Sequence, residues 1–222
     1  MKRIKIIQQN RLPHIRPIGA TFFITISLAD ALPRHVINDL KADFEQEKAR
    51  IEKAHPTDAT LRIYEAQKRY FGKYDHQLDA APYGACYLRK PDVARIVANK
   101  LKEMDGEYFE LQAYCIMPNH IHFLADTSIQ LDRPEIIDEQ NLDTLYTQLD
   151  DILHLFKGNT AYYANQAIGR KGKFWQKDSY DHFVRNDKEW GNIVNYILQN
   201  PVKAGFVNQP SEWEFSYYKY ER

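Results

Sequence analysis

Two apolar stretches on either side of Pro118 and Asn119 constrain the fold of this chain more than any other feature. Residues 107–117 and 120–126 are rich in aliphatic, aromatic and β-branched side chains, and a Pro-Asn pair is typical of a turn. The sequence therefore predicts a β-hairpin with its turn at residues 118–119. Residues 20–28 have the same strand-like composition and predict a further strand.

The second strand of this hairpin carries His120 and His122. Residues two apart on a strand point to the same face, so both imidazoles project together while Ile121 and Phe123 face a core. Neutral imidazole is the commonest metal ligand in proteins, and two imidazoles on one rigid strand make half of a metal site. The alternative interpretation is a pair of surface histidines on a half-buried strand.

A second constellation lies further along the chain, at Tyr196 and Asn200. Residues 188–197 have apolar side chains at spacings of three and four, which predicts an amphipathic helix. Residues four apart share a helix face, and Pro201 disfavours continuation, so Asn200 is expected at or near the last turn. The pair could then place a phenol oxygen and a third metal ligand beside the histidines. The alternative is ordinary packing and helix capping.

The remaining segments alternate between predicted strands and helices in a chain of 222 residues. Helices are predicted at 33–53, 59–73, 91–104 and 142–168, an acidic loop at 127–141 and a short strand at 181–185. This order favours an α+β fold, with an antiparallel sheet and helices on one face. We expect a single domain over residues 1–222, with a helical insertion at about 41–82 and a C-terminal tail at about 206–222.

Charge is distributed unevenly along the chain, although the net charge is zero. Residues 1–20 carry five Lys or Arg and no acid, and residues 157–188 carry seven Lys or Arg against three Asp. Residues 126–151 carry eight acids and a single cation, Arg133. A neutral protein can present a basic face when its acids are gathered elsewhere, whereas a mixed solvated surface is the alternative.

Cysteine usage and hydropathy bear on the cellular compartment. Cys86 and Cys115 are too few and too scattered for a disulfide framework or a thiolate zinc site, which favours a reducing, cytoplasmic setting. The sequence has no apolar segment of signal-peptide or membrane-spanning length, so we expect no membrane partner.

Four runs of residues, in their order and spacing, resemble one family of DNA-processing enzymes. They are Met117-Pro118-Asn119-His120-Ile121-His122, Gly172-Lys173-Phe174-Trp175-Gln176, Tyr180-Asp181-His182 with Val184-Arg185, and Tyr196-Ile197-Leu198-Gln199-Asn200-Pro201-Val202-Lys203-Ala204-Gly205. The chain resembles, from residue 107 to about residue 217, the REP-associated branch of the single-tyrosine HUH transposases. The resemblance implies a ferredoxin-like domain and metal-dependent cleavage of single-stranded DNA through a 5′-phosphotyrosine.

By this resemblance His120 and His122 are metal ligands, Tyr196 is the nucleophile and Asn200 is a third ligand. The resemblance implies Mg²⁺ or Mn²⁺ as the cofactor, and a mixed set of imidazole and amide ligands fits Mn²⁺. Tyr180 is a competing nucleophile, because on a strand it would share a face with His182 as a nucleophile–base pair. Residues 41–82 have no obvious place in a minimal domain of this family.

DNA contacts are expected at a basic and aromatic loop, residues 169–176. Its cations would follow phosphates and Trp175 would stack on an unpaired base, although Trp175 could instead fill the core. The full set of expected DNA-binding residues is Lys157, Arg170, Lys171, Lys173, Trp175, Arg185 and Lys203.

These features favour an enzyme that nicks and rejoins single-stranded DNA presented with a hairpin, in transposition or in mobilisation of repeat elements. Two alternatives stay open. One is a metal-dependent phosphoesterase in which metal-bound water attacks, and the other is a domesticated nucleic-acid-binding protein that does not cleave. The sequence leaves both a monomer and a homodimer open.

Overall fold

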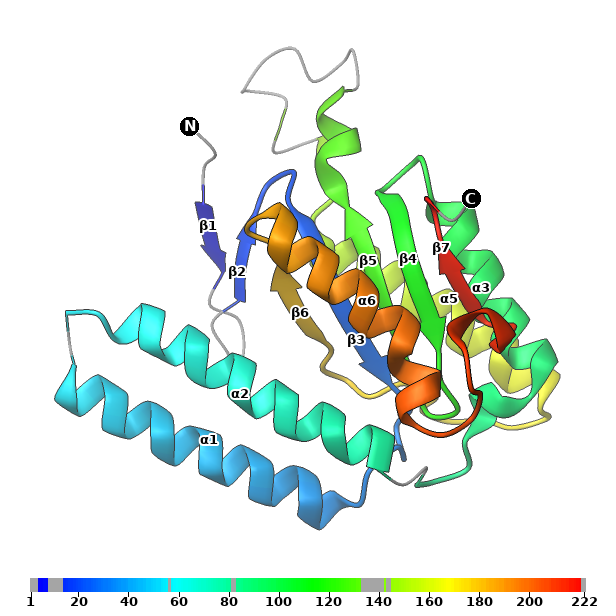
Figure 1. Ribbon diagram of the computed structural model, residues 1–222, viewed down its shortest axis with the longest axis horizontal. Coiled ribbons are helices and arrows are strands. Elements are labelled where there is room, and N and C mark those ends of the chain that lie inside the picture. Colours follow the sequence, from blue (N-terminus) through cyan, green and yellow to red (C-terminus); the bar gives the residue numbers. More distant parts are fainter. Residues whose placement is uncertain are drawn as a thin grey trace.

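An antiparallel sheet of five strands, in the order β6-β3-β5-β4-β7, forms the centre of the structure (Figure 1). The computed structural model describes residues 4–7, 14–55, 57–80, 83–132, 142 and 145–220. The strands are β3 (Thr21–Ser27), β4 (Glu110–Ile116), β5 (His120–Asp126), β6 (Tyr180–Phe183) and β7 (Ser216–Tyr218). A separate two-stranded sheet pairs β1 (Ile4–Ile7) with β2 (His14–Pro17). The predicted hairpin is confirmed as β4 and β5.

Six of these elements make a ferredoxin-like unit. In chain order they are β3, α3 (Pro91–Met104), β4, β5, α5 (Leu149–Ala167) and β6. In the sheet, the last of the four strands, β6, lies beside the first, β3, and β5 and β4 follow on the other side of β3. The predicted α+β class and antiparallel sheet are therefore confirmed. β7 extends the sheet beyond β4, within residues that the sequence assigns to a tail. A strand of three residues is too short for periodicity to reveal.

Helices cover both faces of the sheet (Figure 1). Phe22 and Ile24 of β3 point to the face that packs on α3 and α5, whereas Phe23 points to the opposite face. Ile197 of α6 (Asp187–Lys203) and Phe71 of α2 (Ala59–Ala80) pack on that opposite face. α3 and α5 form the predicted layer of helices on one face, and α6 and the insertion helix α2 cover the opposite face. The opposite face of the sheet is covered as well because it also carries apolar side chains, Phe23 with Cys115 and Leu124, that must be removed from water.

The insertion is a helical hairpin made of α1 (Arg34–Ala54) and α2. Both predicted helices are present, and α2 continues to Ala80, past the predicted end at residue 73. Its buried side runs from Tyr64 through Phe71 to Leu78. The extra turns carry α2 along the sheet to the start of β5, where Asn119 donates a hydrogen bond to the Leu78 carbonyl oxygen over 3.3 Å.

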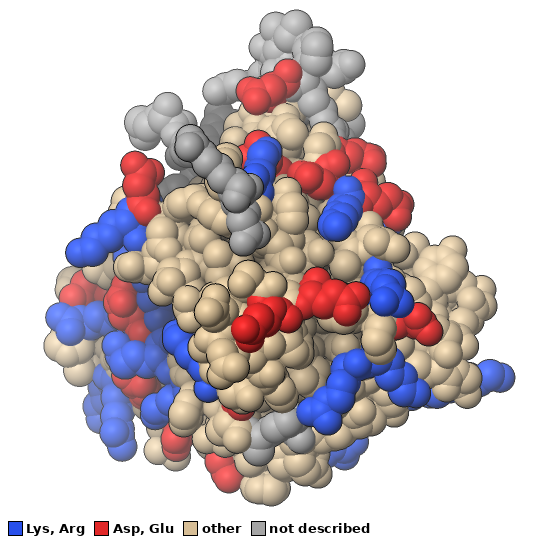
Figure 2. Space-filling view, turned by 45° about the vertical axis from the view of Figure 1, so that its right-hand side comes forward, with Lys and Arg blue, Asp and Glu red and all other residues tan. Residues whose placement is uncertain are grey.

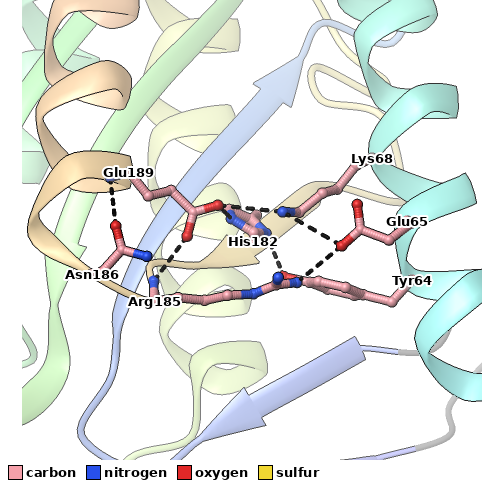
Figure 3. Close-up of polar contacts among 7 residues, drawn as sticks. All are labelled: Tyr64, Glu65, Lys68, His182, Arg185, Asn186 and Glu189. Atoms are coloured by element: carbon pink, nitrogen blue, oxygen red, sulfur yellow. Dashed lines mark hydrogen bonds and ion pairs between the residues drawn. The ribbon is translucent and has the colours of Figure 1, made fainter.

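A polar cluster fastens α2 to β6 and to the start of α6 (Figure 3). The ring of His182 bonds the Tyr64 hydroxyl at Nδ1 over 2.5 Å and the Glu189 carboxylate at Nε2 over 2.8 Å. Lys68 lies 3.3 Å from the same carboxylate, and Arg185 lies 3.4 Å from Glu65. We call these six side chains the α2 clamp. They tie the insertion to the ferredoxin-like unit.

Other segment boundaries differ from the predictions in detail. α5 begins at Leu149 and not at residue 142, because Gln148 keeps an extended backbone (φ −67°, ψ 152°) at the helix start. The first part of the predicted acidic loop is the 3₁₀ helix η2 (Thr127–Asp132), and residues 133–141 lie outside the described residues, as do the cations at 2, 3 and 11. Two further 3₁₀ helices are η1 (Tyr87–Arg89) and η3 (Pro210–Glu212). No helix of the described part of the chain is both long and apolar enough to cross a bilayer.

A buried ion pair joins the small sheet to the large one. Nε and Nη2 of Arg16 in β2 lie 3.0 Å and 2.6 Å from the two carboxylate oxygens of Asp181 in β6. Nη1 lies 2.5 Å from Asp150 at the start of α5. Arg16 is only 7% exposed, so removal of its guanidinium would break a buried ion pair with the Asp181 carboxylate.

We expect Arg16→Ala to lower the free energy of unfolding by about 3–5 kcal/mol, the cost of breaking a buried pair. Urea unfolding followed by circular dichroism measures it. Arg95→Ala is the control, because Arg95 and its partners Asp92 and Glu214 are all exposed and such pairs contribute at most about 1 kcal/mol. Equal effects of the two substitutions would contradict the structural role assigned to Arg16.

Candidate functional site

The paired histidines lie at the centre of the sheet. His120 and His122 point to the same face of β5, as predicted, and their Nε2 atoms are 2.9 Å apart. Both side chains are 0% exposed, because β5 lies between β3 and β4 and because α2 and α6 cover this face. The alternative of two surface histidines is therefore wrong.

Hydrogen bonds at the outer ring nitrogens orient the two imidazoles. Asn119 donates its amide hydrogen to Leu78, so its carbonyl oxygen faces His120 Nδ1, 2.7 Å away. That oxygen can only accept, so Nδ1 carries the proton and Nε2 of His120 presents a lone pair. His122 Nδ1 lies 2.7 Å from the hydroxyl of Thr25, which can either donate or accept. Such outer partners fix the tautomer of metal-binding histidines.

Two carboxylates that the sequence analysis missed reach the histidines from α2. Asp75 Oδ1 lies 3.6 Å from His122 Nε2, and Asp79 Oδ1 lies 3.6 Å from His120 Nε2. The ligand atoms of Asp75, His120 and His122 all lie within 4.8 Å of one another, so these residues could hold a metal ion. The signal was present in the sequence: Asp75 follows Phe71 by four residues on the buried side of α2. It was missed because the helix was predicted to end at residue 73.

Tyr196 and Asn200 approach the histidines from α6. Asn200 Nδ2 lies 3.5 Å from the Tyr196 hydroxyl and 3.4 Å from Asp79 Oδ2. The centre of the Tyr196 ring lies 5.4 Å from that of His122. The ammonium of Lys203 sits 4.9 Å from the same tyrosine ring. α6 includes Pro201 and ends at Lys203, so Asn200 lies in its last turn, as expected.

The donor set fits a divalent cation. Among the described residues, Asp75 Oδ1, Asp79 Oδ1 and Asn200 Oδ1 are buried without a hydrogen-bond partner, and each such atom costs about 1–3 kcal/mol. The two Nε2 atoms lie 2.9 Å apart, and both are within 4.8 Å of the Asp75 ligand oxygen. Mixed imidazole and carboxylate oxygen donors suit a transition metal such as Mn²⁺.

Burial also sets the protonation states. It lowers the pKa of His120 to about 3 and that of His122 well below its usual range, so both imidazoles are neutral and able to bind a metal. It raises the pKa of Asp79 to about 6 and that of Asp75 well above its usual range. A bound cation would favour the ionised carboxylates instead, so metal binding is expected to release protons.

The competing tyrosine has a different environment. The ring of Tyr180 stacks on Phe71 with centroids 3.4 Å apart and an interplanar angle of 10°, and burial raises the pKa of its hydroxyl. His182 shares a strand face with Tyr180 but bonds Tyr64 and Glu189 in the α2 clamp. Both ring nitrogens of His182 therefore have other partners than Tyr180, and Tyr180 stays the alternative nucleophile.

The aromatic part of the expected DNA-binding loop is buried. Trp175 is 5% exposed and donates a hydrogen bond from Nε1 to the Thr160 hydroxyl over 2.9 Å. Trp175 therefore fills the core, and its predicted role as a stacking platform is wrong. The physical reason is that residues 174–175 continue alongside the end of β3, where Trp175 forms a bridge with Leu28.

The expected cations are dispersed. The ammonium of Lys203 lies next to the Tyr196 ring, and Arg185 belongs to the α2 clamp. Lys157 donates to the Lys177 carbonyl oxygen over 2.8 Å, and burial lowers its pKa to about 8. The remaining three, Arg170, Lys171 and Lys173, lie on the loop before β6, with Arg170 4.9 Å from the Tyr87 ring centre. On the face shown in Figure 2 basic and acidic side chains intermingle, which favours a mixed surface there over a broad basic one.

The raised pKa of Asp79 predicts a pH effect on stability without metal. The Asp79 carboxyl group stays protonated up to about pH 6 in the folded chain, but only up to about pH 3.9 in the unfolded chain. This difference stabilises the folded state fully below pH 3.9, and the stabilisation is lost as the pH rises through 6. Asp79→Asn removes it. In chelator, the variant should gain about 2–3 kcal/mol relative to the unaltered chain between pH 4 and pH 7. The exposed Asp43→Asn is the control, and a pH-independent difference for Asp79→Asn would refute the assignment.

Metal binding is the direct test of the donor set. Calorimetry should detect Mn²⁺ binding, His120→Ala should abolish it, and Asp75→Asn should weaken it by more than about tenfold, since even outer-shell changes cost 10–100-fold. Asp43→Asn, on the exposed side of α1, should bind like the unaltered chain. Undiminished Mn²⁺ affinity in His120→Ala would remove the metal assignment.

Comparisons with known proteins show what this chain is similar to. No protein-family model matches the chain. Over 108 residues, 49% of the chain, it is 34% identical to a protein of Haemophilus influenzae provisionally named a REP-associated tyrosine transposase, covering 58% of that protein. Over 108 residues it is 31% identical to the REP-associated tyrosine transposase of Escherichia coli K12, covering 53% of it. The chain thus spans little more than half the length of these curated relatives.

One solved structure is also similar, that of a REP-associated tyrosine transposase bound to a REP hairpin. The likeness covers 95% of this chain and 82% of that one, at 18% identity and a TM-score of 0.41. The sequence matches show that this chain is similar to REP-associated tyrosine transposases.

Proposed function

We propose that this protein nicks and rejoins single-stranded DNA through a phosphotyrosine at Tyr196, with a divalent cation at the histidine pair. One observation carries the proposal. Asn200 links the Tyr196 hydroxyl, 3.5 Å away, to the buried group of imidazoles and carboxylates through Asp79, 3.4 Å away. The sequence similarity to transposases supports the reaction class, and mobilisation of repeat elements is the role that fits it.

His120, His122 and Asp75 would hold the cation, with the orphaned oxygen of Asn200 as a further ligand. A divalent cation supplies Lewis-acid catalysis, since it withdraws charge from a non-bridging phosphate oxygen. Mn²⁺ or Mg²⁺ fits the oxygen donors, and the imidazoles favour Mn²⁺. Thr25 and Asn119 keep the two rings oriented through their Nδ1 atoms.

The phenol oxygen of Tyr196 would attack phosphorus. A phosphorus–oxygen bond forms to tyrosine, the bond to the 3′-oxygen breaks, and that oxygen leaves with a proton as a 3′-hydroxyl. The covalent intermediate conserves the bond energy for rejoining, which hydrolysis would lose. A free tyrosine has a pKa of about 10, so its ionisation needs assistance. The ammonium of Lys203, 4.9 Å from the ring centre, favours the phenolate electrostatically, and Asn200 Nδ2 can donate to it.

Substrate would reach the site from the side of Tyr196. The histidines are completely buried, whereas the Asp79 side chain is 19% exposed, Tyr196 is half-buried and Lys203 is exposed. These three residues therefore define the open side of the site. A phosphate entering there would meet the ammonium first and the phenol next.

Hydrolysis by metal-bound water is a second candidate, because Asp75 and Asp79 supply carboxylates that could act as its general base. In that reaction no protein–DNA bond forms. A denaturing gel with labelled single-stranded DNA that carries a hairpin separates the two reactions, because only the tyrosine mechanism leaves an adduct that survives denaturation.

We expect Tyr196→Phe to abolish both cleavage and adduct in Mn²⁺, by at least about a thousandfold in rate, because only the attacking oxygen is removed. DNA binding and folding should persist. Tyr180→Phe is the matched control: its ring packs on Phe71, and the variant should still form the adduct.

The opposite pattern, with the adduct lost in Tyr180→Phe and kept in Tyr196→Phe, would assign the nucleophile to Tyr180. Cleavage without an adduct in either variant and in the unaltered chain would favour hydrolysis by metal-bound water.

A further inference from the structure

A pocket separates the insertion from the sheet next to the histidine site. It lies between α1 and α2 on one side and β3 with the residues before β6 on the other, and it encloses about 650 Å³ counted out to its open mouth. The nucleophile and metal ligands proposed above do not line it.

Aromatic rings form much of the pocket wall. Tyr70 and Tyr74 of α2 lie with ring centres 6.4 Å apart at an angle of 31°, and Phe71 stacks on Tyr180 beside them. Three of these four rings come from the insertion. Flat aromatic faces are what a nucleobase stacks on when it leaves a strand of DNA.

Polar groups in the wall are placed to read a flat, hydrogen-bonding ligand. Gln67 is 3% exposed, and its Oε1 is buried without a hydrogen-bond partner among the described residues. An unpaired buried oxygen is costly unless a ligand donates to it. Gln176 brings a second amide to the lining, and its Nε2 donates to the Ala29 carbonyl oxygen over 2.9 Å.

One of the residues that line the pocket, Lys41, is positively charged and partly exposed to solvent. Lys41 of α1 has 47% of its side chain exposed and lies 3.8 Å from Asp178, whose side chain is 70% exposed. A pair this open contributes little, so the ammonium can turn to a phosphate. The pocket thus combines aromatic faces, an unpaired amide oxygen and a cation.

The side chain of Thr25 separates the pocket from the histidine pair. Thr25 belongs to its lining, and the same threonine bonds His122 Nδ1 over 2.7 Å. A base in the pocket would therefore belong to a nucleotide close to the phosphate held at His122.

We propose that this pocket binds one unstacked base of the single-stranded DNA, at a nucleotide next to the scissile phosphate. The proposal rests on the function proposed above. The base lies among Tyr70, Tyr74 and Tyr180, a base N–H donates to Gln67 Oε1, and Lys41 contacts the adjoining phosphate. The insertion thereby serves as a base-reading element, which gives the α1–α2 hairpin a role in substrate selection.

The test measures binding in chelator, so that no cleavage is needed. The probe is a fluorescent DNA hairpin with a single-stranded tail, in which each tail position in turn is made abasic. In the unaltered chain, loss of the base at one tail position should weaken binding by about 5- to 150-fold, the range for one stacked base. Ser179→Tyr fills the pocket from its lining, and this position-specific loss should vanish in that variant.

Ser211→Tyr is the matched control, because Ser211 is exposed on η3 and does not line the pocket. It should keep the profile of the unaltered chain. Gln67→Leu keeps the volume of the side chain and removes the unpaired oxygen, so it should fold and should lose discrimination at the same position. It serves as the second test should Ser179→Tyr fail to fold.

An abasic profile unchanged in Ser179→Tyr, or in Gln67→Leu if that is the variant that folds, would overturn the pocket assignment while leaving strand cleavage at Tyr196 intact. A position-specific profile without any adduct in Mn²⁺ would keep the pocket and overturn the tyrosine mechanism. No binding of the probe by the unaltered chain would overturn both.

Discussion

The packing of α2 against the face of the sheet that carries the histidines is the interaction on which the rest of the site depends. It buries His120 and His122 completely, and it brings Asp75 and Asp79 within 3.6 Å of them. It also supplies most of the aromatic wall of the neighbouring pocket. Without α2, the imidazoles would keep only the cover that α6 provides on this face. With α2 in place, the imidazoles stay neutral, and the carboxyl groups of Asp75 and Asp79 lie beside them in surroundings with little water.

This arrangement is unfavourable for the metal-free protein and must be stabilised elsewhere. Three buried oxygens without partners and two carboxyl groups with raised pKa values all destabilise the docked position of α2. Opposing contributions come from the apolar contact of Phe71 with Tyr180 and from the α2 clamp around His182. A divalent cation would neutralise the two carboxylates and satisfy the orphaned oxygens, and so it would also fasten α2 to the sheet. Metal binding and the position of the insertion are therefore expected to be coupled.

One face of the sheet packs into the apolar core, and the other face carries the candidate site. α3 and α5 pack on one side with Phe22, Ile24 and Phe123, which makes an apolar core of the ordinary kind. That core holds β5 rigid, so the imidazoles on its other side keep a fixed separation. α6 places Tyr196 and Asn200 beside this fixed pair of imidazoles. Lys203, the last residue of α6, lies next to the Tyr196 ring. The chemistry thus stands on two elements whose local geometry is regular.

Regular local geometry is what the sequence by itself determined. The period of two along β5 placed both histidines on one face, and the period of 3.6 along α6 placed Tyr196 above Asn200. The β-hairpin and the helices at 91–104 and 59–73 follow from such short-range patterns. The ferredoxin-like arrangement was implied by the resemblance to the transposases, which rests on motifs in the same sequence.

Only the tertiary structure decided which segments distant in the chain meet. Periodicity places Asp75 on the buried side of α2, but it does not state what that side covers, so the sequence could not predict the approach of Asp75 to His122. The same limit explains Trp175, whose burial depends on its bridge to Leu28, and Tyr180, whose partner is Phe71. These contacts join residues about fifty to 150 positions apart, where packing and desolvation, and not backbone propensity, determine the outcome.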